Sequence, residues 1–380
     1  MPAPLRILVV TRSYPAAGNL YQYPFVHRRV LAYLAEGHHV AVFRPDTAHA
    51  GSYEHEGVTC IEGWRGQLDR VRNDFRPDVL AVHGLSEQLT PVLEGILGAV
   101  PICAWLHGSE IPEFARRKGM LMAGSQRETA LSLVEDRCAF WREFLGRWPE
   151  RFRLVFPSFA AVAMAREDLG QALVGDRLSV IPNPIDTDLF SYSRKADELR
   201  LAILMIRPFD SASYGNDLAV RAIELLKGRE QFERLRFTLV GDGSLHDETV
   251  GPVRSLPNVT IEQRFLVQEE IAALHRSHGI FLVPTRLDTQ GVSRDEAMAS
   301  GLVPVTNRVA AVPEFVDESC GMLAGPEDSP GLAEGLWRLV QDSALFEQLS
   351  AAAAQRVRRQ TGHKLIIPQE LNLLHEAASW

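Results

Sequence analysis

Two acidic residues that flank a glycine loop are the first feature whose chemistry can be inferred from the sequence. Asp288 and Glu296 are separated by seven residues, and Gly291 lies between them. The apolar run "IFLVP" precedes this stretch. A buried strand followed by a glycine loop and a helix N-terminus is a geometry that binds phosphate, because unpaired amides point outward there. Residues 287–301 are therefore a candidate site for a ligand with hydroxyls and phosphates.

The same stretch also has an ordinary structural interpretation. Ser293 and Glu296 have the S-x-x-E spacing of a capping box, in which the serine caps a helix amide and the glutamate bonds back to the cap residue. The helix would then end at Gly301, a favourable C-terminal glycine. This alternative leaves Asp288 and the "TQGV" loop unexplained, and both interpretations stay open on these residues alone.

Length and composition restrict the class of protein. A chain of 380 residues exceeds the usual size of a single core, so two domains are expected. The net charge of −8 argues against a general nucleic-acid binder. The four cysteines form no CxxC pair, which favours reduced thiols in a cytosol and gives no metal framework. Because no apolar run reaches about 18 residues, we expect no membrane span.

Short apolar runs alternate with helical patterns in both halves of the sequence, and "RILVVT" near the start is expected to form a buried strand rather than a signal peptide. Such alternation predicts parallel sheets with helices on both faces. The pattern restarts after "IPNPIDTDLF", whose two prolines form a stiff connector. We therefore expect one domain over 1–182 and a second over 183–367. A further helix, with Pro368 in its first turn, is expected over 368–380.

The ends of the predicted strands are where a ligand would bind. Doubly wound sheets bind ligands at the carboxyl ends of their strands. The stretch 287–301 follows such a strand in the second domain, and Gly18 and Asn19 follow the first strand of the first domain. The sequence has no G-x-G-x-x-G and no G-x-x-x-x-G-K-[ST] motif, which disfavours nicotinamide enzymes and P-loop NTPases.

Four stretches together resemble the retaining glycosyltransferases of family 4, also called glycosyltransferase group 1. The most specific is "PTRLDTQGVSRDEAMASGLVPV", which is similar to the E-x7-E segment of that family. The other three are 6–40, 180–190, and 203–226 with 237–245. The resemblance implies the α/β GT-B fold, in which two Rossmann-like doubly wound parallel-sheet domains face a central cleft. It also implies that the final helix packs back on the first domain.

The resemblance assigns roles in donor binding to residues of the second domain. Glu296 would bind the ribose hydroxyls of a nucleotide, since a carboxylate can accept from two hydroxyls at once. Asp288 would hold hydroxyls of the transferred sugar. Arg207 would neutralise the charge that develops on the leaving diphosphate. Backbone amides at a helix N-terminus would bind the diphosphate; they belong to Gly291, Val292 and Ser293.

Further roles follow from the same resemblance. His107, at the end of a first-domain strand, would lie beside the donor sugar, and His83 is a weaker candidate on the preceding strand. Gly18 would let the first loop approach the phosphate or sugar closely. Phe265 would lie near the nucleobase or in the core, and Glu110 would touch acceptor hydroxyls.

Three positions depart from the family pattern. The first acid is Asp288 rather than glutamate, so its side chain is shorter by one methylene. A lysine that the family commonly has near Ser213 and Tyr214 is absent. The glycine pair often seen in the first loop is the single Gly18. Arg207 therefore remains as half of the usual basic pair.

The resemblance implies a cytoplasmic enzyme of bacterial surface polysaccharide synthesis. It would transfer a hexose from a nucleotide sugar, with UDP as the expected nucleotide, to a glycan or lipid-linked acceptor. No metal is expected to be essential, and the D-x-D of "IDTDLF" is interpreted as structural. Two alternatives stay open, namely a nucleotide-sugar 2-epimerase of the same architecture and an inactive homologue that serves as a binding subunit.

Residues 112–156 mix basic and aromatic side chains in a chain that is acidic as a whole. Nine basic residues and six acidic residues fall within this range. Trp141, Phe144 and Trp148 lie among them. Such a surface could rest on the cytoplasmic face of the inner membrane, where a lipid-linked acceptor would be held. The alternative is one amphipathic helix that packs on its own domain.

Overall fold

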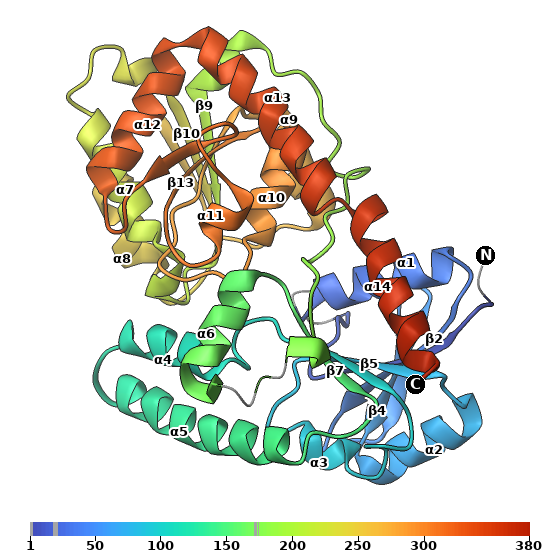
Figure 1. Cartoon of the computed structure of the whole chain (residues 1–380). Helices are drawn as coiled ribbons and strands as arrows, with labels where there is room; N and C mark the ends of the chain where they lie inside the picture. Colours follow the sequence, from blue (N-terminus) through green and yellow to red (C-terminus); the bar gives the residue numbers. More distant parts are fainter. Residues whose placement is uncertain (1–2, 18–21, 171–172, 174) are drawn as a thin grey trace. The chain divides into compact units, whose positions relative to one another are not determined.

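The computed structural model of the chain describes residues 3–17, 22–170, 173 and 175–380. Gly18 and Asn19, which the sequence placed near the ligand, lie outside the described residues. Each half of the chain forms a parallel sheet with helices on both sides (Figure 1).

Two compact units make up the chain. Unit 1 comprises residues up to Arg116 together with Glu128–Asn183 and Ile366–Trp380. Unit 2 comprises Arg117–Arg127 and Pro184–Leu365. Unit 1 is therefore discontinuous in sequence, and it includes residues that follow the whole of unit 2.

Unit 1 contains an eight-stranded sheet in the order β3-β4-β2-β1-β5-β6-β7-β8. All neighbouring strands are parallel except β3 and β4, which form an antiparallel hairpin at one edge. The strands are β1 (Arg6–Thr11), β2 (His39–Pro45), β3 (Gly51–His55), β4 (Val58–Gly63), β5 (Val79–His83), β6 (Ile102–Trp105), β7 (Phe152–Phe156) and β8 (Leu178–Val180). The helices that lie wholly or partly in this unit are α1 (Pro24–Ala35), α2 (Arg65–Phe75), α3 (Thr90–Leu93), α4 (Pro112–Met120), α5 (Gly124–Gly146), α6 (Phe159–Leu169) and α14 (His363–Ala378).

Unit 2 contains a six-stranded parallel sheet in the order β11-β10-β9-β12-β13-β14. Its strands are β9 (Ala202–Ile206), β10 (Arg236–Val240), β11 (Val259–Glu262), β12 (Ile280–Leu282), β13 (Val303–Asn307) and β14 (Met322–Ala324). Its helices are α7 (Asn216–Leu226), α8 (His246–Val250), α9 (Gln268–Ser277), α10 (Val292–Ala299), α11 (Val312–Phe315), α12 (Ser329–Gln341) and α13 (Ser343–Gln360).

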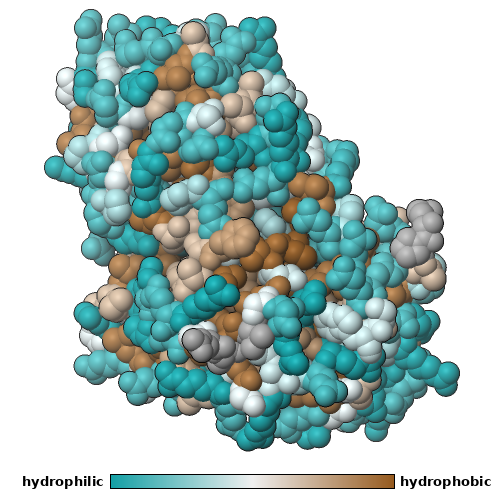
Figure 2. Space-filling model, viewed as in Figure 1, coloured by the Kyte–Doolittle hydropathy of each residue, from teal (hydrophilic) through white to brown (hydrophobic). Residues whose placement is uncertain are grey.

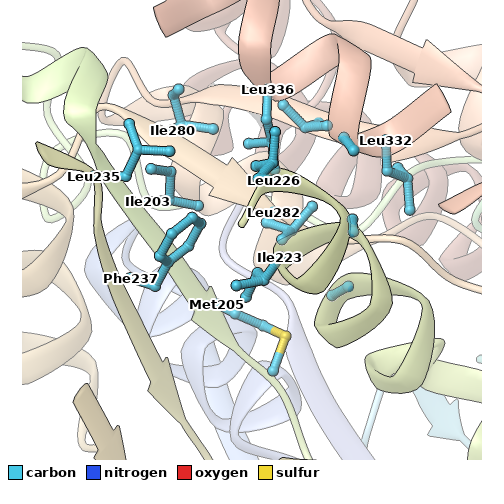
Figure 3. Close-up of a cluster of buried hydrophobic side chains, with 14 of the residues drawn as sticks. Ile203, Met205, Ile223, Leu226, Leu235, Phe237, Ile280, Leu282, Leu332 and Leu336 are labelled. Carbon is cyan, nitrogen blue, oxygen red and sulfur yellow. The ribbon is translucent and has the colours of Figure 1, made fainter. Parts of the chain in front are cut away.

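The central strands are mostly apolar because helices cover both faces of each sheet. In β5 and β13 every residue is buried. Figure 3 shows part of the core of unit 2, where Met205 and Phe237 from the sheet lie near Ile223 of α7. The outer helices of this unit present mainly hydrophilic residues on the face seen in Figure 2. Among the described residues, no helix combines the length and the apolar character needed to cross a bilayer.

The order of the strands reverses once in each sheet, and this fixes where a ligand can bind. In unit 1 the chain runs outward from β1 to β2 and then returns to place β5 on the other side of β1. In unit 2 the same reversal occurs between β9 and β12. The loops that follow such a pair of strands diverge and leave a crevice at the carboxyl edge of the sheet. The residues after β9 and β12 are therefore the first place to look for a site in unit 2.

The helix α14 packs on unit 1 through buried polar and apolar contacts. Its apolar residues join the core that contains β1 and α1 (Figure 1). The carboxylate of Glu370 accepts from the Nε of Arg29 at 2.9 Å and from the hydroxyl of Tyr33 at 2.6 Å. The Nη2 of Arg29 also donates to the Oδ1 of Asn183 at 2.9 Å. One buried guanidinium thus holds both the last residue before unit 2 and the helix that follows it.

The structure differs from the sequence-based elements mainly at edges and ends. The edge strands β3 and β14 and the helix α4 were not predicted. Residues 87–97 also have the spacing of apolar residues that predicts a helix, but they contain only the four-residue α3 and turns. The final helix begins at His363, five residues before Pro368, so Pro368 lies inside it rather than in its first turn.

Candidate active site

The loop that leaves β12 is fixed by reciprocal hydrogen bonds to the end of β13. The amide nitrogen of Thr285 donates to the Oδ1 of Asn307 at 2.9 Å, and the Nδ2 of Asn307 donates to the carbonyl of Thr285 at 2.8 Å. The hydroxyl of Thr285 reaches the carbonyls of Ser213 and Leu287, each at 3.0 Å. All these contacts are buried, so the loop enters the acidic stretch in one defined position.

The helix α10 begins at Gly291 and not at Ser293. Gly291 is the N-cap residue with φ 100°, a left-handed conformation that favours glycine, and no side chain caps the helix. Ser293 is therefore the second residue of the helix and cannot be its cap. The capping-box interpretation of Ser293 and Glu296 is wrong, and among the described residues no side chain caps the first amides of α10.

Arg207 lies directly after β9 and turns its guanidinium toward the start of α10. Its Nη1 donates to the Oγ of Ser293 at 3.4 Å, a long contact. The side chain is 8% exposed, and its Nε has no hydrogen-bond partner among the described residues. Burial lowers the pKa of Arg207, and the carboxylate of Asp288 acts in the opposite direction. A buried cation with an unused N–H beside a helix N-terminus is suited to hold an anion.

Tyr214 occupies the position where the resemblance led us to look for a lysine. Its ring faces the guanidinium of Arg207, with the Cζ 5.4 Å from the ring centroid. Burial raises the pKa of Tyr214 above its ordinary value, and the nearby cation of Arg207 opposes this rise. The phenol therefore orients the arginine and adds no second positive charge.

The two acids of the opening stretch lie on either side of the helix start. Asp288 is half-buried, and its Oδ1 accepts from the amide of Gln290 at 3.1 Å. Glu296 is half-buried on α10, three residues after Ser293 and thus on the same helix face. The stretch therefore combines Arg207, uncapped amides and two carboxylates at the carboxyl edge of the sheet.

A buried ion pair, which the sequence analysis did not predict, supports the loop that precedes α10. The guanidinium of Arg294 bonds to the carboxylate of Asp295 at 2.8 Å and to the carbonyl of Gln290 at 2.5 Å. The Nε2 of Gln290 also donates to Asp295 at 3.1 Å. A Cβ atom at Gly291 would come within 2.7 Å of Arg294, so this support also requires glycine at 291.

His107 and His83 form a pair at the carboxyl edge of the sheet in unit 1. The Nδ1 of His83 is 3.1 Å from the Nε2 of His107, and the two rings stack with an interplanar angle of 14°. Burial lowers the pKa of both imidazoles well below the ordinary value. Both rings are therefore neutral near pH 7, and one of the facing nitrogens donates to the other. His83 is fully buried, so it positions His107, which is partly exposed.

Glu110 is placed for a different task from the one expected. It is 1% exposed, and its Oε2 accepts from the amides of His107 at 2.9 Å and Gly108 at 3.0 Å. Its Oε1 accepts from the hydroxyl of Ser109 at 3.0 Å. A carboxylate with these partners shapes the loop that carries His107 and is not available for acceptor hydroxyls.

The exposure of Phe265 and the partners of Asp186 and Asp188 bear on two other expectations. Phe265 follows β11 and is 44% exposed, so it is not a core residue.

In the connector, the Oδ1 of Asp186 accepts from the amide of Asp188 at 3.0 Å. Asp188 itself pairs with Lys364 at 2.6 Å. The D-x-D thus shapes a turn and anchors it to the start of α14.

The aromatic residues of 112–156 do not face solvent as a membrane contact would require. Trp141 is 1% exposed and Phe144 is 8% exposed, because α5 packs this side on its own unit. The apolar side chains that remain exposed in this range are aliphatic, and Leu133 is 50% exposed. The interpretation of α5 as an amphipathic helix packed on its own domain therefore accounts for the aromatics.

Part of the chain matches a known protein family. Residues 200–342 match the family model described as glycosyl transferases group 1. The sulfoquinovosyl transferase SQD2 of Arabidopsis thaliana is 23% identical over 195 residues, which are 50% of this chain and 38% of that protein. The phosphatidyl-myo-inositol mannosyltransferase of Mycobacterium leprae is 28% identical over 251 residues, which are 64% and 63% of the two chains. This chain spans less than half the length of the first four curated relatives that it matches.

A solved structure shares the fold over nearly the whole chain. HepE of Anabaena, determined with UDP and glucose, superposes with a TM-score of 0.69 at 15% identity and covers 97% of this chain and 99% of its own. The fold expected from the sequence, with two Rossmann-like parallel-sheet domains, is thereby confirmed. The matched region 200–342 also contains Arg207, Asp288, Gly291 and Glu296. Residues 200–342, most of unit 2, are thus similar to the glycosyl transferases of group 1.

Proposed function

We propose that this chain is a retaining hexosyltransferase that takes its sugar from a UDP-sugar. The observation that carries the proposal is Arg207, a buried guanidinium with an unused N–H beside the uncapped start of α10. A diphosphate supplies the oxygens that both features lack. The structure of HepE with UDP and glucose, which has the same fold, supports UDP as the nucleotide.

The roles of the remaining residues follow from their places around α10. Glu296 binds the ribose hydroxyls, and Asp288 holds hydroxyls of the transferred sugar. The amides of Gly291, Val292 and Ser293 bind the diphosphate. Arg207 stabilises the charge that builds on the leaving group, an electrostatic contribution that is usually among the largest in such reactions.

The mechanism uses the leaving phosphate itself as a base. A double displacement would need a carboxylate free to attack the sugar, about 5 Å from a second one. In this proposal both Asp288 and Glu296 are engaged with hydroxyls. The acceptor hydroxyl therefore attacks from the face that the diphosphate leaves, and a phosphate oxygen takes its proton. His107, held neutral by burial and by the nearby charge of Arg29, donates or accepts a hydrogen bond at the donor sugar.

The acceptor is proposed to be a glycan or a lipid-linked sugar of the bacterial surface. The relative from Mycobacterium leprae is named as a mannosyltransferase that acts on a phosphatidylinositol lipid, which supports this class. The reaction would take place in the cytoplasm or at the cytoplasmic face of the membrane. A nucleotide-sugar 2-epimerase of the same architecture is the alternative, and the following test distinguishes it from a transferase.

A direct test measures binding and turnover with a panel of nucleotide sugars. UDP-, GDP-, ADP- and CMP-sugars are compared by thermal shift, since a ligand that binds the folded state stabilises it by RT ln(1 + [L]/Kd). The nucleotide that stabilises most is then supplied as a radiolabelled sugar. Hydrolysis or transfer supports the proposal. Interconversion of two sugar nucleotides would establish an epimerase instead, and binding without turnover would establish an inactive homologue.

Replacing Glu296 by alanine is expected to weaken nucleotide binding without unfolding the protein. The lost pair of charge-assisted hydrogen bonds should lower the binding free energy by roughly 2–4 kcal/mol. The melting temperature should change little, because Glu296 does not cap α10. Calorimetry with UDP measures the first effect and thermal unfolding the second. Glu248→Ala, at an exposed glutamate of α8, is the matched control. A variant that binds UDP normally but melts much lower would return Glu296 to a structural role.

Turnover is expected to need no divalent cation. Arg207 and the amides of α10 supply the positive charge that Mg²⁺ supplies in other transferases. Excess EDTA should therefore leave the rate within about twofold, measured well below the melting temperature. An enzyme that EDTA silences and Mg²⁺ or Mn²⁺ restores would contradict this and direct attention to Asp186 and Asp188.

A further inference from the structure

Two histidines and a glutamate of unit 1 form a cluster that uses none of the residues proposed for catalysis. His27 lies on α1, while His55 and Glu56 lie at the turn between β3 and β4. One potential ligand atom from each lies within 4.8 Å of the other two. The Nε2 of His27 is 3.2 Å from the Oε2 of Glu56, and the Nε2 of His55 is 3.9 Å from its Oε1. Atoms that bind one zinc ion at about 2.0–2.2 Å are themselves separated by roughly 3–4 Å.

The orientation of His27 is fixed from its other side. The hydroxyl of Tyr14 lies 2.6 Å from the Nδ1 of His27, and both side chains are buried. With the Nδ1 bonded to this phenol, the Nε2 is the nitrogen that faces Glu56. A histidine that binds a metal through one nitrogen is usually held through the other in this way.

An ordinary ion pair accounts poorly for the cluster. His27 is 4% exposed, so a charged imidazolium at this position would lose most of its hydration. The ring of His55 lies 4.6 Å from it, centroid to centroid, and a second imidazolium there would repel the first. Neutral imidazoles beside a carboxylate are the protonation states that bind a metal.

The turn that carries Glu56 is itself unusual. Glu56 has φ 47° and Gly57 has φ 76°, so both residues are left-handed. Two-residue hairpin turns of this kind favour Asn-Gly or Asp-Gly, because most side chains are disfavoured in that conformation. Here the first position holds a glutamate whose carboxylate reaches a buried histidine of another element.

We propose that His27, His55 and Glu56 bind Zn²⁺, with water as the fourth ligand, and that the ion fastens the β3–β4 hairpin to α1. Two imidazoles and one carboxylate with an open position are a typical zinc donor set. The side chain of Glu56 is 63% exposed, which leaves a path for the ion and for the water.

The position of the cluster gives the ion a structural task. β3 is the edge strand of the sheet and pairs only with β4 within the described residues. The ion would add a second attachment for this hairpin. It would also tie Tyr14 and His27 together, and these two residues bracket the segment after β1. The site goes beyond the proposed transfer reaction, because none of its ligands is assigned to the donor sugar.

Metal binding to the full chain, prepared without a polyhistidine tag, tests the proposal. Co²⁺ is added to the metal-free protein, and the visible absorption of a tetrahedral Co²⁺ site is followed. Zn²⁺ should then displace the Co²⁺ and remove the absorption. His55→Asn and Glu56→Gln should each weaken the Zn²⁺ affinity at least tenfold, and Tyr14→Phe about tenfold.

Matched controls come from the same region of the chain. His49→Asn replaces a histidine whose side chain is 80% exposed, and Glu54→Gln replaces an exposed glutamate of β3. Neither should change the Co²⁺ spectrum or the Zn²⁺ affinity. Thermal unfolding of each metal-free variant verifies that it is folded. Absence of a tetrahedral spectrum in the unaltered protein overturns the proposal and leaves only an ion pair between His27 and Glu56. Equal affinities of the variants and the unaltered protein overturn it as well, because the ion would then lie elsewhere.

Discussion

Replacing Arg207 by methionine is expected to lower kcat by about 10²–10³-fold, the effect of removing one preorganised charge or donor from the leaving group. Methionine fills similar space, so the change removes the charge and the donors with little loss of packing. The fall should appear in kcat more than in KM, because the charge on the diphosphate develops fully only as the bond to the sugar breaks. Steady-state kinetics with the nucleotide sugar selected above measure both constants.

Although the kcat of the Arg207→Met variant should fall, its stability should stay the same or increase. The Nε of Arg207 has no partner among the described residues, and its Nη1 makes only a long contact to Ser293. Removing a buried, incompletely paired cation relieves its desolvation, so the melting temperature should stay or rise. Arg264→Met, at an arginine that is half-exposed and paired with Glu262 and Glu270, is the matched control. A kcat within threefold of the unaltered enzyme would remove Arg207 from the mechanism.

Replacing Glu370 by alanine is expected to destabilise unit 1 by about 3–5 kcal/mol, because it leaves the guanidinium of Arg29 buried without its counter-charge. The side chains of Arg29 and Glu370 are 1% and 0% exposed, so water cannot take the place of the lost carboxylate. The hydroxyl of Tyr33 loses its acceptor at the same time. Few single changes in this chain should have a larger effect on stability.

Tryptophan fluorescence in urea reports this effect selectively. Five of the six tryptophans lie in unit 1, and Trp337 lies in unit 2. A chain with two units need not unfold in one step, so the transitions are fitted separately. Glu376→Ala, at an exposed residue of the same helix, should change the midpoint little.

A double variant separates the ion pair from the packing. Arg29→Met with Glu370→Leu removes both charges and should recover much of the stability lost in Glu370→Ala, since the two effects are coupled. If the double variant is as unstable as the sum of the single ones, the shape of the helix contact matters more than its charges.

The sequence predicted the central strands of both sheets because those strands are continuous apolar runs. It did not predict β3, which is short and polar and pairs on one side only with β4. It also did not predict α4, in which four of nine residues are charged. Edge elements need little apolar surface, so their sequences carry little periodic signal.

In the candidate site, too, the sequence indicated residue types and short spacings, but it did not indicate contacts between residues that are far apart along the chain. The glycine and the two acids were recognised from type and spacing, and Arg207 from the resemblance to the family. One of the two interpretations of the stretch placed the helix start at Ser293 because S-x-x-E spacing is local, whereas the left-handed Gly291 depends on the buried Arg294 and Asp295 beside it. The pairing of His107 with His83 depends on β5 and β6 being neighbours in the sheet, which no spacing along the chain reveals.

The discontinuity of unit 1 sets the order in which the protein can fold during synthesis. The ribosome completes residues 184–365, all but a short segment of unit 2, before it makes the part of α14 that packs on unit 1. Until then the sheet of unit 1 lacks Glu370, and Arg29 has no carboxylate partner in the core. Domains generally fold as units while translation proceeds. Unit 2 is therefore the part that can reach its final state first, although most of unit 1 leaves the ribosome before it.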